Sequence, residues 1–143
     1  MADAPLHAGL DPRLDADSLF LAGLALRQVR LQDDARYPWL VLIPKGIDLV
    51  ELEDLDASER ILLMEEIVRA GRAVRVLADA LGSPVEKLNV GALGNVVRQL
   101  HVHVIGRRAD DPAGAAPVWG VGTAQPYEAA AREVALEALR GVL

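Results

Sequence analysis

The sequence predicts an α+β fold in which an antiparallel sheet is covered by one long helix and a C-terminal helix. Strand-like apolar runs stand both before and after a single long amphipathic segment between Asp56 and Gly82. These runs do not alternate with helices, as they would in a parallel βαβ fold. A second helical pattern, rich in alanine, follows at residues 128–140.

The composition is that of a globular domain whose main partner is not a nucleic acid. Of the 143 residues, 52% are hydrophobic and 25% are charged, so we expect one domain spanning residues 1–143 with a substantial core. The formal net charge of −6 opposes binding to a phosphate backbone. The sequence contains no cysteine, no signal-peptide pattern and no apolar run near the ~20 residues of a membrane helix. We therefore expect a cytoplasmic protein without nucleic-acid or membrane partners.

The first part of the chain predicts an irregular arm and a pair of strands. Pro5 and Pro12 disfavour regular structure within residues 1–17. Residues 18–21 and 24–32 are rich in apolar side chains and are separated by Ala-Gly, which suits a turn. We expect these two runs to form neighbouring strands.

A central strand is predicted at residues 39–43. Trp-Leu-Val-Leu-Ile is a continuous apolar run closed by Pro44, and such runs are typical of strands that are covered on both faces. Leucine-bearing turns are expected at residues 46–55, before the long helix begins.

The long helix has clear start and stop signals. Asp56 and Glu59 have the spacing of a capping box, and Gly82 suits the position just after the last turn. Met64 is expected to fill the core. The predicted apolar stripe comprises Ile61, Met64, Ile67 or Val68, Gly71, Val74, Leu77 and Leu81, with Leu62, Leu63 and Val76 off the stripe.

The last third of the chain predicts two neighbouring strands, at residues 86–92 and 99–106. A loop rich in Pro, Ala, Asp and Gly follows at residues 109–116, and then a short docked segment at 117–120. Pro126 suits a first helical position, and Gly141 can end the C-terminal helix.

The candidate functional residues lie in the strand expected at residues 99–106. Strict alternation places Gln99, His101 and His103 on one face of that strand. Leu100 and Val102 face the other side. A glycine-punctuated loop just upstream can bring backbone N–H groups close to the imidazoles.

Three interpretations of this pair of histidines are open from the residues alone. They can be satisfied structural imidazoles, or ligands of a metal ion, or they can include a nucleophile. A metal site needs a third ligand, yet there is no cysteine, His7 lies in the arm and this strand carries no carboxylate. A neutral imidazole attacks phosphorus through one nitrogen when the other donates to a carbonyl group.

The segment from Asn89 to Ile105 resembles the signature of the histidine triad (HIT) family. That signature is His-φ-His-φ-His-φ-φ, where φ is hydrophobic, preceded by a Gly-Gln-Ser/Thr-Val turn and an upstream Asn. The Trp39–Lys45 strand, the long helix and the Pro-Val-Trp-Gly segment fall in the family's order. The resemblance therefore implies a HIT-like fold for most of the chain.

The resemblance also implies roles for individual residues. His101 matches the middle histidine, the nucleophile that takes up a nucleotidyl group, and His103 matches the third. Gly94 and Asn95 match the residues that line the phosphate site. Asn89 matches an asparagine that reaches the ribose or phosphate.

Three positions depart from the family pattern. Gln99 replaces the first histidine; as a catalytic residue its amide can hold a phosphate oxygen but cannot act as an acid. Val96 replaces a hydroxyl residue, and Arg98 replaces a proline or aromatic residue. These changes leave the nucleophile in place but affect protonation of the leaving group.

The function implied by the resemblance is that of a nucleotide-binding phosphohydrolase or nucleotidyltransferase. It would attack an α-phosphate through a covalent nucleotidyl-histidine intermediate, on a phosphoester, phosphoanhydride or phosphoramidate, without a metal or other cofactor. One alternative is a nucleotide-binding module with little turnover, and another is an interaction protein. The resemblance further implies a homodimer.

Overall fold

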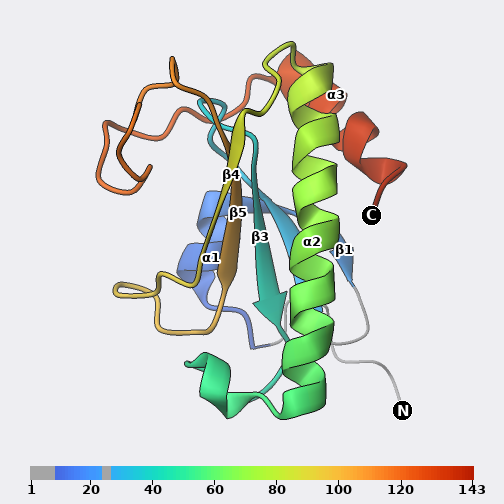
Figure 1. Ribbon diagram of the computed structural model, residues 1–143, viewed down its shortest axis with the longest axis vertical. Helices are drawn as coiled ribbons and strands as arrows, with labels where there is room; N and C mark the ends of the chain where they lie inside the picture. The colour runs from blue at the N-terminus through green and yellow to red at the C-terminus, as the bar shows by residue number, and fades with distance from the viewer. Residues whose placement is uncertain (1–8, 24–26) are drawn as a thin grey trace.

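The computed structural model describes residues 9–23 and 27–143, and it has the predicted α+β architecture (Figure 1). Within these residues one antiparallel sheet has the strand order β1-β2-β3-β5-β4. The strands are β1 (Ser18–Gly23), β2 (Arg27–Gln32), β3 (Trp39–Pro44), β4 (Lys87–Gly91) and β5 (Val102–Arg107). The helices are α1 (Pro12–Asp17), α2 (Ala57–Ala80) and α3 (Ala129–Arg140), with a 3-10 turn η1 (Leu52–Asp54).

The central strand is β3, as predicted. It pairs with β2 on one side and β5 on the other, and all six of its residues are buried. Leu40 and Leu42 face the core that lies under α2, whereas Trp39, Val41 and Ile43 face a second apolar cluster. Both faces of the strand are therefore covered, which explains why its sequence shows no polar alternation.

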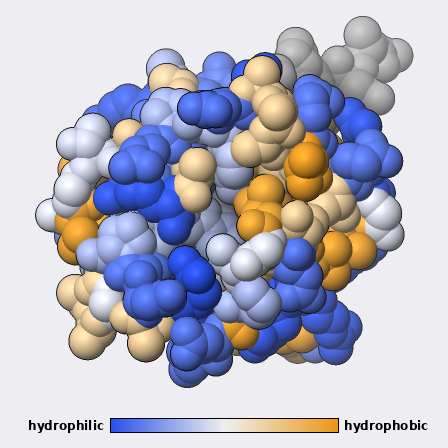
Figure 2. Space-filling model, turned by 90° about the horizontal axis from the view of Figure 1, so that it is seen from above, coloured by the Kyte–Doolittle hydropathy of each residue, from blue (hydrophilic) through white to orange (hydrophobic). Residues whose placement is uncertain are grey.

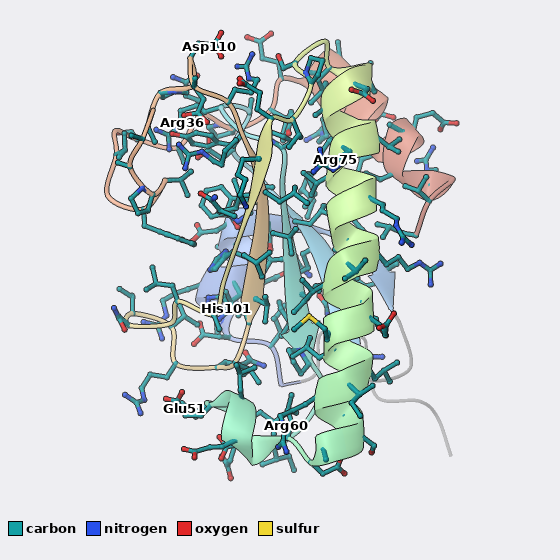
Figure 3. All side chains as sticks on the ribbon, in the orientation of Figure 1. Arg36, Glu51, Arg60, Arg75, His101 and Asp110 are labelled. Carbon is teal, nitrogen blue, oxygen red and sulfur yellow. The ribbon has the colours of Figure 1, made fainter. Side chains whose placement is uncertain are left out.

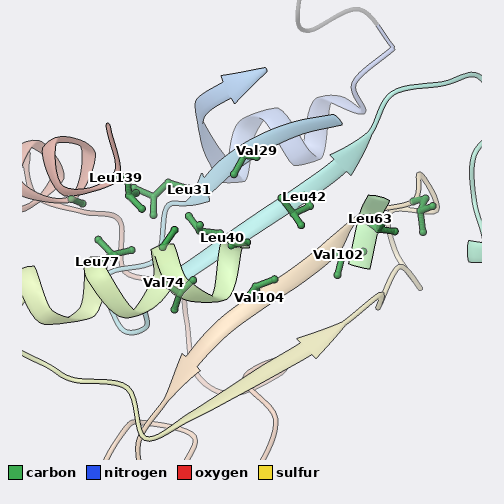
Figure 4. Close-up of a cluster of buried hydrophobic side chains, with 14 of the residues drawn as sticks. Val29, Leu31, Leu40, Leu42, Leu63, Val74, Leu77, Val102, Val104 and Leu139 are labelled. Atoms are coloured by element: carbon green, nitrogen blue, oxygen red, sulfur yellow. The ribbon is translucent and has the colours of Figure 1, made fainter. Parts of the chain in front are cut away.

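The long helix α2 covers one face of the sheet (Figure 1). The predicted capping box is confirmed, because Asp56 and Glu59 each accept a hydrogen bond from the other's backbone N–H. Gly82 follows the last turn with φ 78°, a left-handed conformation that favours glycine. Val74 and Leu77 of α2 pack with side chains of β2, β3, β5 and α3 in one cluster (Figure 4).

The first half of the predicted helix stripe is wrong except at Ile67, the alternative to Val68, which packs against the core. Ile61, Met64 and Val68 are exposed, so Met64 does not fill the core, while Leu63 is buried. The buried face instead includes three alanines, at positions 70, 73 and 78. Small side chains let the helix lie close to the sheet, but they add little to a hydrophobic pattern, so the sequence did not mark them, whereas Gly71, Val74 and Leu77 of the predicted stripe are buried.

Helix α1 corrects the prediction of an irregular arm, of which residues 1–8 lie outside the described part. Asp11 caps the helix by accepting a hydrogen bond from the Arg13 backbone N–H at 2.8 Å. Pro12 starts the helix, because its missing N–H is not needed in the first turn. Leu14 anchors α1 on the sheet face opposite to α2. The prediction that a proline occupies the first helical position is wrong for the C-terminal helix. Helix α3 starts at Ala129, three residues after Pro126, and Gly141 ends it as predicted.

The predicted strand ends agree with the structure to within one residue except at three places. Strand β1 continues through Gly23, where a turn was expected, and residues 24–26 of the expected second strand lie outside the described part. The expected loop at 109–116 is present, and Val118 is buried, which confirms the docked segment after it. The third exception is the start of β5, which bears on the site.

Strand β5 passes α2 at a glycine. A Cβ on Gly106 would lie 2.6 Å from a methyl group of Val85, 2.7 Å from the Pro38 ring and 3.1 Å from a Val74 methyl. Contacts that short are not tolerated, so the helix, the Pro38 turn and β5 fit together only because position 106 has no side chain.

Figure 2 shows the end of the molecule at which α2 finishes. Hydrophilic side chains cover most of this end and hydrophobic ones gather on one side of it. Among the described residues, no helix has the length and apolar character needed to cross a membrane.

Candidate active site

The two histidines of the predicted motif lie together at the start of β5; Figure 3 labels His101. The strand begins at Val102, so Gln99 and His101 belong to the segment that leads into it, not to the strand predicted from residue 99. The alternation nevertheless holds, because Leu100, Val102 and Val104 all enter the core under α2. The rings of His101 and His103 meet edge-on, with centroids 4.8 Å apart.

The hydrogen bonds of His101 fix its tautomer. Its Nδ1 lies 2.6 Å from the carbonyl oxygen of Gln99, and an oxygen acceptor requires the hydrogen to be on Nδ1. In the neutral ring Nε2 then keeps its lone pair. The residue is only 5% exposed, yet it lines a surface cavity, so the ring is held firmly while an edge remains accessible.

His103 is held in the opposite tautomer. The indole Nε1–H of Trp39 donates to its Nδ1 at 3.0 Å, so Nε2 carries the hydrogen in the neutral ring. Burial, and to a smaller extent the neighbouring His101, lowers the pKa of His103 to about 4, although a hydrogen bond with the Leu93 backbone acts to raise it. His103 is therefore an uncharged N–H donor at neutral pH.

The cavity beside His101 has a volume of about 240 Å³. It lies at the end of the sheet near η1, where Figure 3 places Glu51. Its lining includes Glu51, Ala92, Gly94, Asn95, Arg98, Gln99 and His101. A Cβ on Gly94 would lie 2.7 Å from the Val97 carbonyl oxygen and 3.5 Å from Cε1 of His101, so glycine lets this loop come close to the imidazole.

The structure brings together four of the six predicted site residues in this cavity: Gly94, Asn95, Gln99 and His101. His103 is not part of the lining but touches His101 from the side of the sheet. Asn89 lies elsewhere, because its side-chain oxygen accepts a hydrogen bond from Arg107 at 2.9 Å and it lines a different cavity.

The amide of Gln99 has partners that the sequence gave no reason to expect. Its oxygen accepts from the Asp11 backbone N–H at 2.7 Å, and its nitrogen donates to the Gly9 carbonyl at 2.9 Å. One amide N–H is left over for other partners. Two contacts were thus missed: the bond from the Trp39 indole to His103, although an indole N–H seeks an acceptor, and the bond from Asp11 to Gln99, for which no sequence signal existed.

A metal site finds no support in the geometry. Among the described residues no group of three or more His, Asp or Glu side chains is arranged to hold a metal ion. Nδ1 of His101 donates to a carbonyl oxygen and Nδ1 of His103 accepts from an indole N–H, so of the two neutral rings only His101 keeps a free lone pair, on Nε2. The arrangement suits attack by a neutral Nε2 on an electrophile bound in the cavity.

Comparisons with known proteins agree with the resemblance seen in the sequence. Residues 14–110 match the HIT domain family. A histidine triad protein from Bradyrhizobium japonicum is 41% identical, with a TM-score of 0.86, and the match covers 94% of this chain and 96% of that one. A histidine triad protein from Sinorhizobium meliloti 1021 is 40% identical over 94% and 96% of the two chains, with a TM-score of 0.83.

A third solved structure, a histidine triad protein from Marinobacter aquaeolei VT8, is 33% identical with a TM-score of 0.85, and 94% of each chain is covered. A search of curated proteins gave no match. With the domain match, the fold and the paired imidazoles in agreement, this chain belongs to the HIT domain family.

Proposed function

We propose that the protein is a nucleotide phosphohydrolase or nucleotidyltransferase that attacks an α-phosphate with Nε2 of His101. The observation that carries this proposal is the hydrogen bond from Nδ1 of His101 to the Gln99 carbonyl, beside a cavity that can hold a phosphate group. This bond orients the lone pair and stabilises the imidazolium that forms on attack.

The proposed reaction has two steps. The Nε2 lone pair forms a bond to phosphorus while the bond from phosphorus to the leaving group breaks, and the departing group takes its proton from solvent. Water or another acceptor then attacks phosphorus and gives up its proton to solvent, and the electron pair of the P–N bond returns to Nε2 as the nucleotide is released. Arg98, Asn95 and backbone N–H groups near Gly94 are the proposed ligands of the phosphate oxygens.

The decisive experiment is to trap the intermediate. The protein is mixed with adenosine and guanosine 5′-phosphoramidates, quenched rapidly and examined by mass spectrometry. We expect a mass gain of one nucleotidyl group that maps to His101, followed by its loss as product accumulates. Turnover without such an adduct, under conditions that trap a known covalent phosphohistidine, would contradict the covalent route.

Asn95→Ala is expected to lower kcat/KM by an amount equivalent to ~1–3 kcal/mol, if the amide donates to a phosphate oxygen in the transition state. Steady-state kinetics with the best phosphoramidate measures the effect. Gln125→Ala is the matched control, because it removes an exposed amide that is not part of the cavity. Equal kinetics for the two variants would remove Asn95 from the proposed site.

A second candidate function is a nucleotide-binding module with little turnover. Gln99 favours it, because an amide cannot protonate a leaving group and two of its hydrogen-bonding atoms already serve the Gly9–Asp11 backbone. Tight binding of AMP or GMP by calorimetry, together with no release of amine over hours, would support the module and contradict the enzyme.

We also propose that the protein is a homodimer. Ile61, Met64 and Val68 form a patch on α2 with exposed fractions of 68%, 58% and 45%, and an isologous contact would cover it. Sedimentation equilibrium at micromolar concentration is expected to give a dimer for the native chain and a monomer for Ile61→Glu. Val134→Glu, at an exposed apolar position on α3, should stay dimeric; a native monomer would refute the proposal.

A further inference from the structure

A second cavity adjoins the one that contains His101. It has a volume of about 510 Å³ and lies between residues 9–11 and the segment 46–50. Val50 and Gln99 line both cavities. A molecule whose phosphorus lies beside His101 therefore has a second space next to it, on the far side of Gln99.

One wall of this second cavity is built by the Gln99 side chain. Its amide oxygen accepts from the Asp11 N–H at 2.7 Å and its amide nitrogen donates to the Gly9 carbonyl at 2.9 Å. Arg13 makes a further contact between the same two segments. It donates a hydrogen bond to the Val96 carbonyl at 3.2 Å and forms an ion pair with the Asp11 carboxylate at 3.0 Å. Residues 9–13 are thus fastened to the loop that carries the phosphate ligands proposed above.

The two cavities differ in chemistry. The first is lined by one carboxylate, Glu51, and one guanidinium, Arg98, which can neutralise a phosphate. The second has four apolar lining residues, Leu10, Ile47, Leu49 and Val50, and two carboxylates, Asp11 and Asp48. None of the described residues that line it is basic. Asp11 is paired with Arg13, so the carboxylate of Asp48 is the one that would repel an anionic group there, whereas an apolar group would be partly removed from water.

We propose that the second cavity is the subsite for the leaving group, that it selects uncharged apolar groups over anionic ones, and that Gln99 is the positioning residue that creates it. This inference rests on the proposed reaction at His101. In this proposal Gln99 does not perform the proton transfer of the histidine that the family signature has at this position. Its amide holds residues 9–11 in place as a wall, and the specificity of the enzyme depends on that wall.

The test compares three adenosine 5′-phosphoramidates, whose leaving groups are methylamine, hexylamine and 6-aminohexanoate. The first two amines have nearly equal basicity, so a difference between them reports binding of the chain and not the chemistry. We expect the native protein to favour hexylamine over methylamine by about tenfold or more in kcat/KM, because five added methylene groups become buried. The carboxylate at the end of 6-aminohexanoate should remove that advantage.

Three variants locate the effect. Ile47→Asp should bring the ratio of hexylamine to methylamine close to one, and Ile47→Lys should raise the 6-aminohexanoate substrate relative to hexylamine. Gln99→Leu should also lower the ratio of hexylamine to methylamine, because leucine cannot form the two hydrogen bonds that hold residues 9–11 in place. Val134→Asp on α3 is the control and should keep the native ratio. Each ratio is internal to one protein, so a partly unfolded preparation does not change it.

Failure of the inference and failure of the proposed function give different results. If the native protein releases no amine from any of the three compounds, the proposed reaction is wrong. If it releases all three with equal kcat/KM, or if Ile47→Asp and Gln99→Leu both keep the native ratio, the reaction stands and the leaving-group subsite is overturned.

Discussion

Replacing His101 with alanine is expected to reduce turnover by about 10⁴-fold or more while leaving nucleotide binding nearly intact. Only the covalent step needs the Nε2 lone pair, whereas the proposed phosphate ligands lie on the neighbouring loop. Single-turnover kinetics and calorimetry with AMP measure the two quantities separately. A variant that retains the native rate on a good substrate would remove His101 from the role of nucleophile.

A smaller side chain at the same position offers a sharper test of this role. His101→Gly leaves space beside Gly94, whose backbone already lies close to the imidazole. Added imidazole should then restore part of the turnover, with the nucleotidyl group appearing on free imidazole. The same concentration of imidazole should do nothing for Asn95→Ala, because that variant keeps its nucleophile.

His103 is expected to make the stability of the protein depend on pH in a specific window. Its pKa is lowered from 6.5 to about 4, chiefly by burial and then by His101, so the unfolded chain binds more protons than the native one between these values. The contribution is fully present above pH 6.5 and is lost as pH falls towards 4. A shift of this size corresponds to about 3 kcal/mol in the free energy of unfolding.

Urea unfolding at a series of pH values measures this effect against His103→Asn, which cannot titrate. The acidic groups change the stability of both proteins alike, so the difference between the two curves isolates the imidazole. We expect that difference to grow as pH rises from 4 to about 6.5. Parallel curves, or an NMR titration of His103 near its ordinary pKa, would show that the ring is not held neutral by its surroundings.

The elements with strong local signals were predictable from the sequence. The capping box of Asp56 and Glu59 acts within four residues, and the apolar run of β3 needs only burial on both faces, so neither depends on the rest of the chain. The pairing of His101 with His103 also follows from local alternation. Local rules fix these features because the residues involved are close neighbours in sequence.

The parts that were missed depend on distant contacts. The amide of Gln99 meets Gly9 and Asp11, which are about ninety positions away, and no periodicity links such residues. The donor to His103 is Trp39, 64 residues earlier, which an apolar run had assigned to packing alone. The buried alanines of α2 were missed for a related reason, since a small side chain contributes to packing only where a sheet lies beneath it.

The glycine at position 106 also determines which side of the sheet carries the chemistry. If β5 slid by one residue against its neighbours, a side chain would be forced into the space between Val85, Pro38 and Val74, where no Cβ fits. The same slip would turn His103 away from Trp39 and towards the core under α2. Gly106 therefore fixes the register of β5. In this register the imidazole of His103, three positions earlier, lies on the face of the sheet where it meets His101.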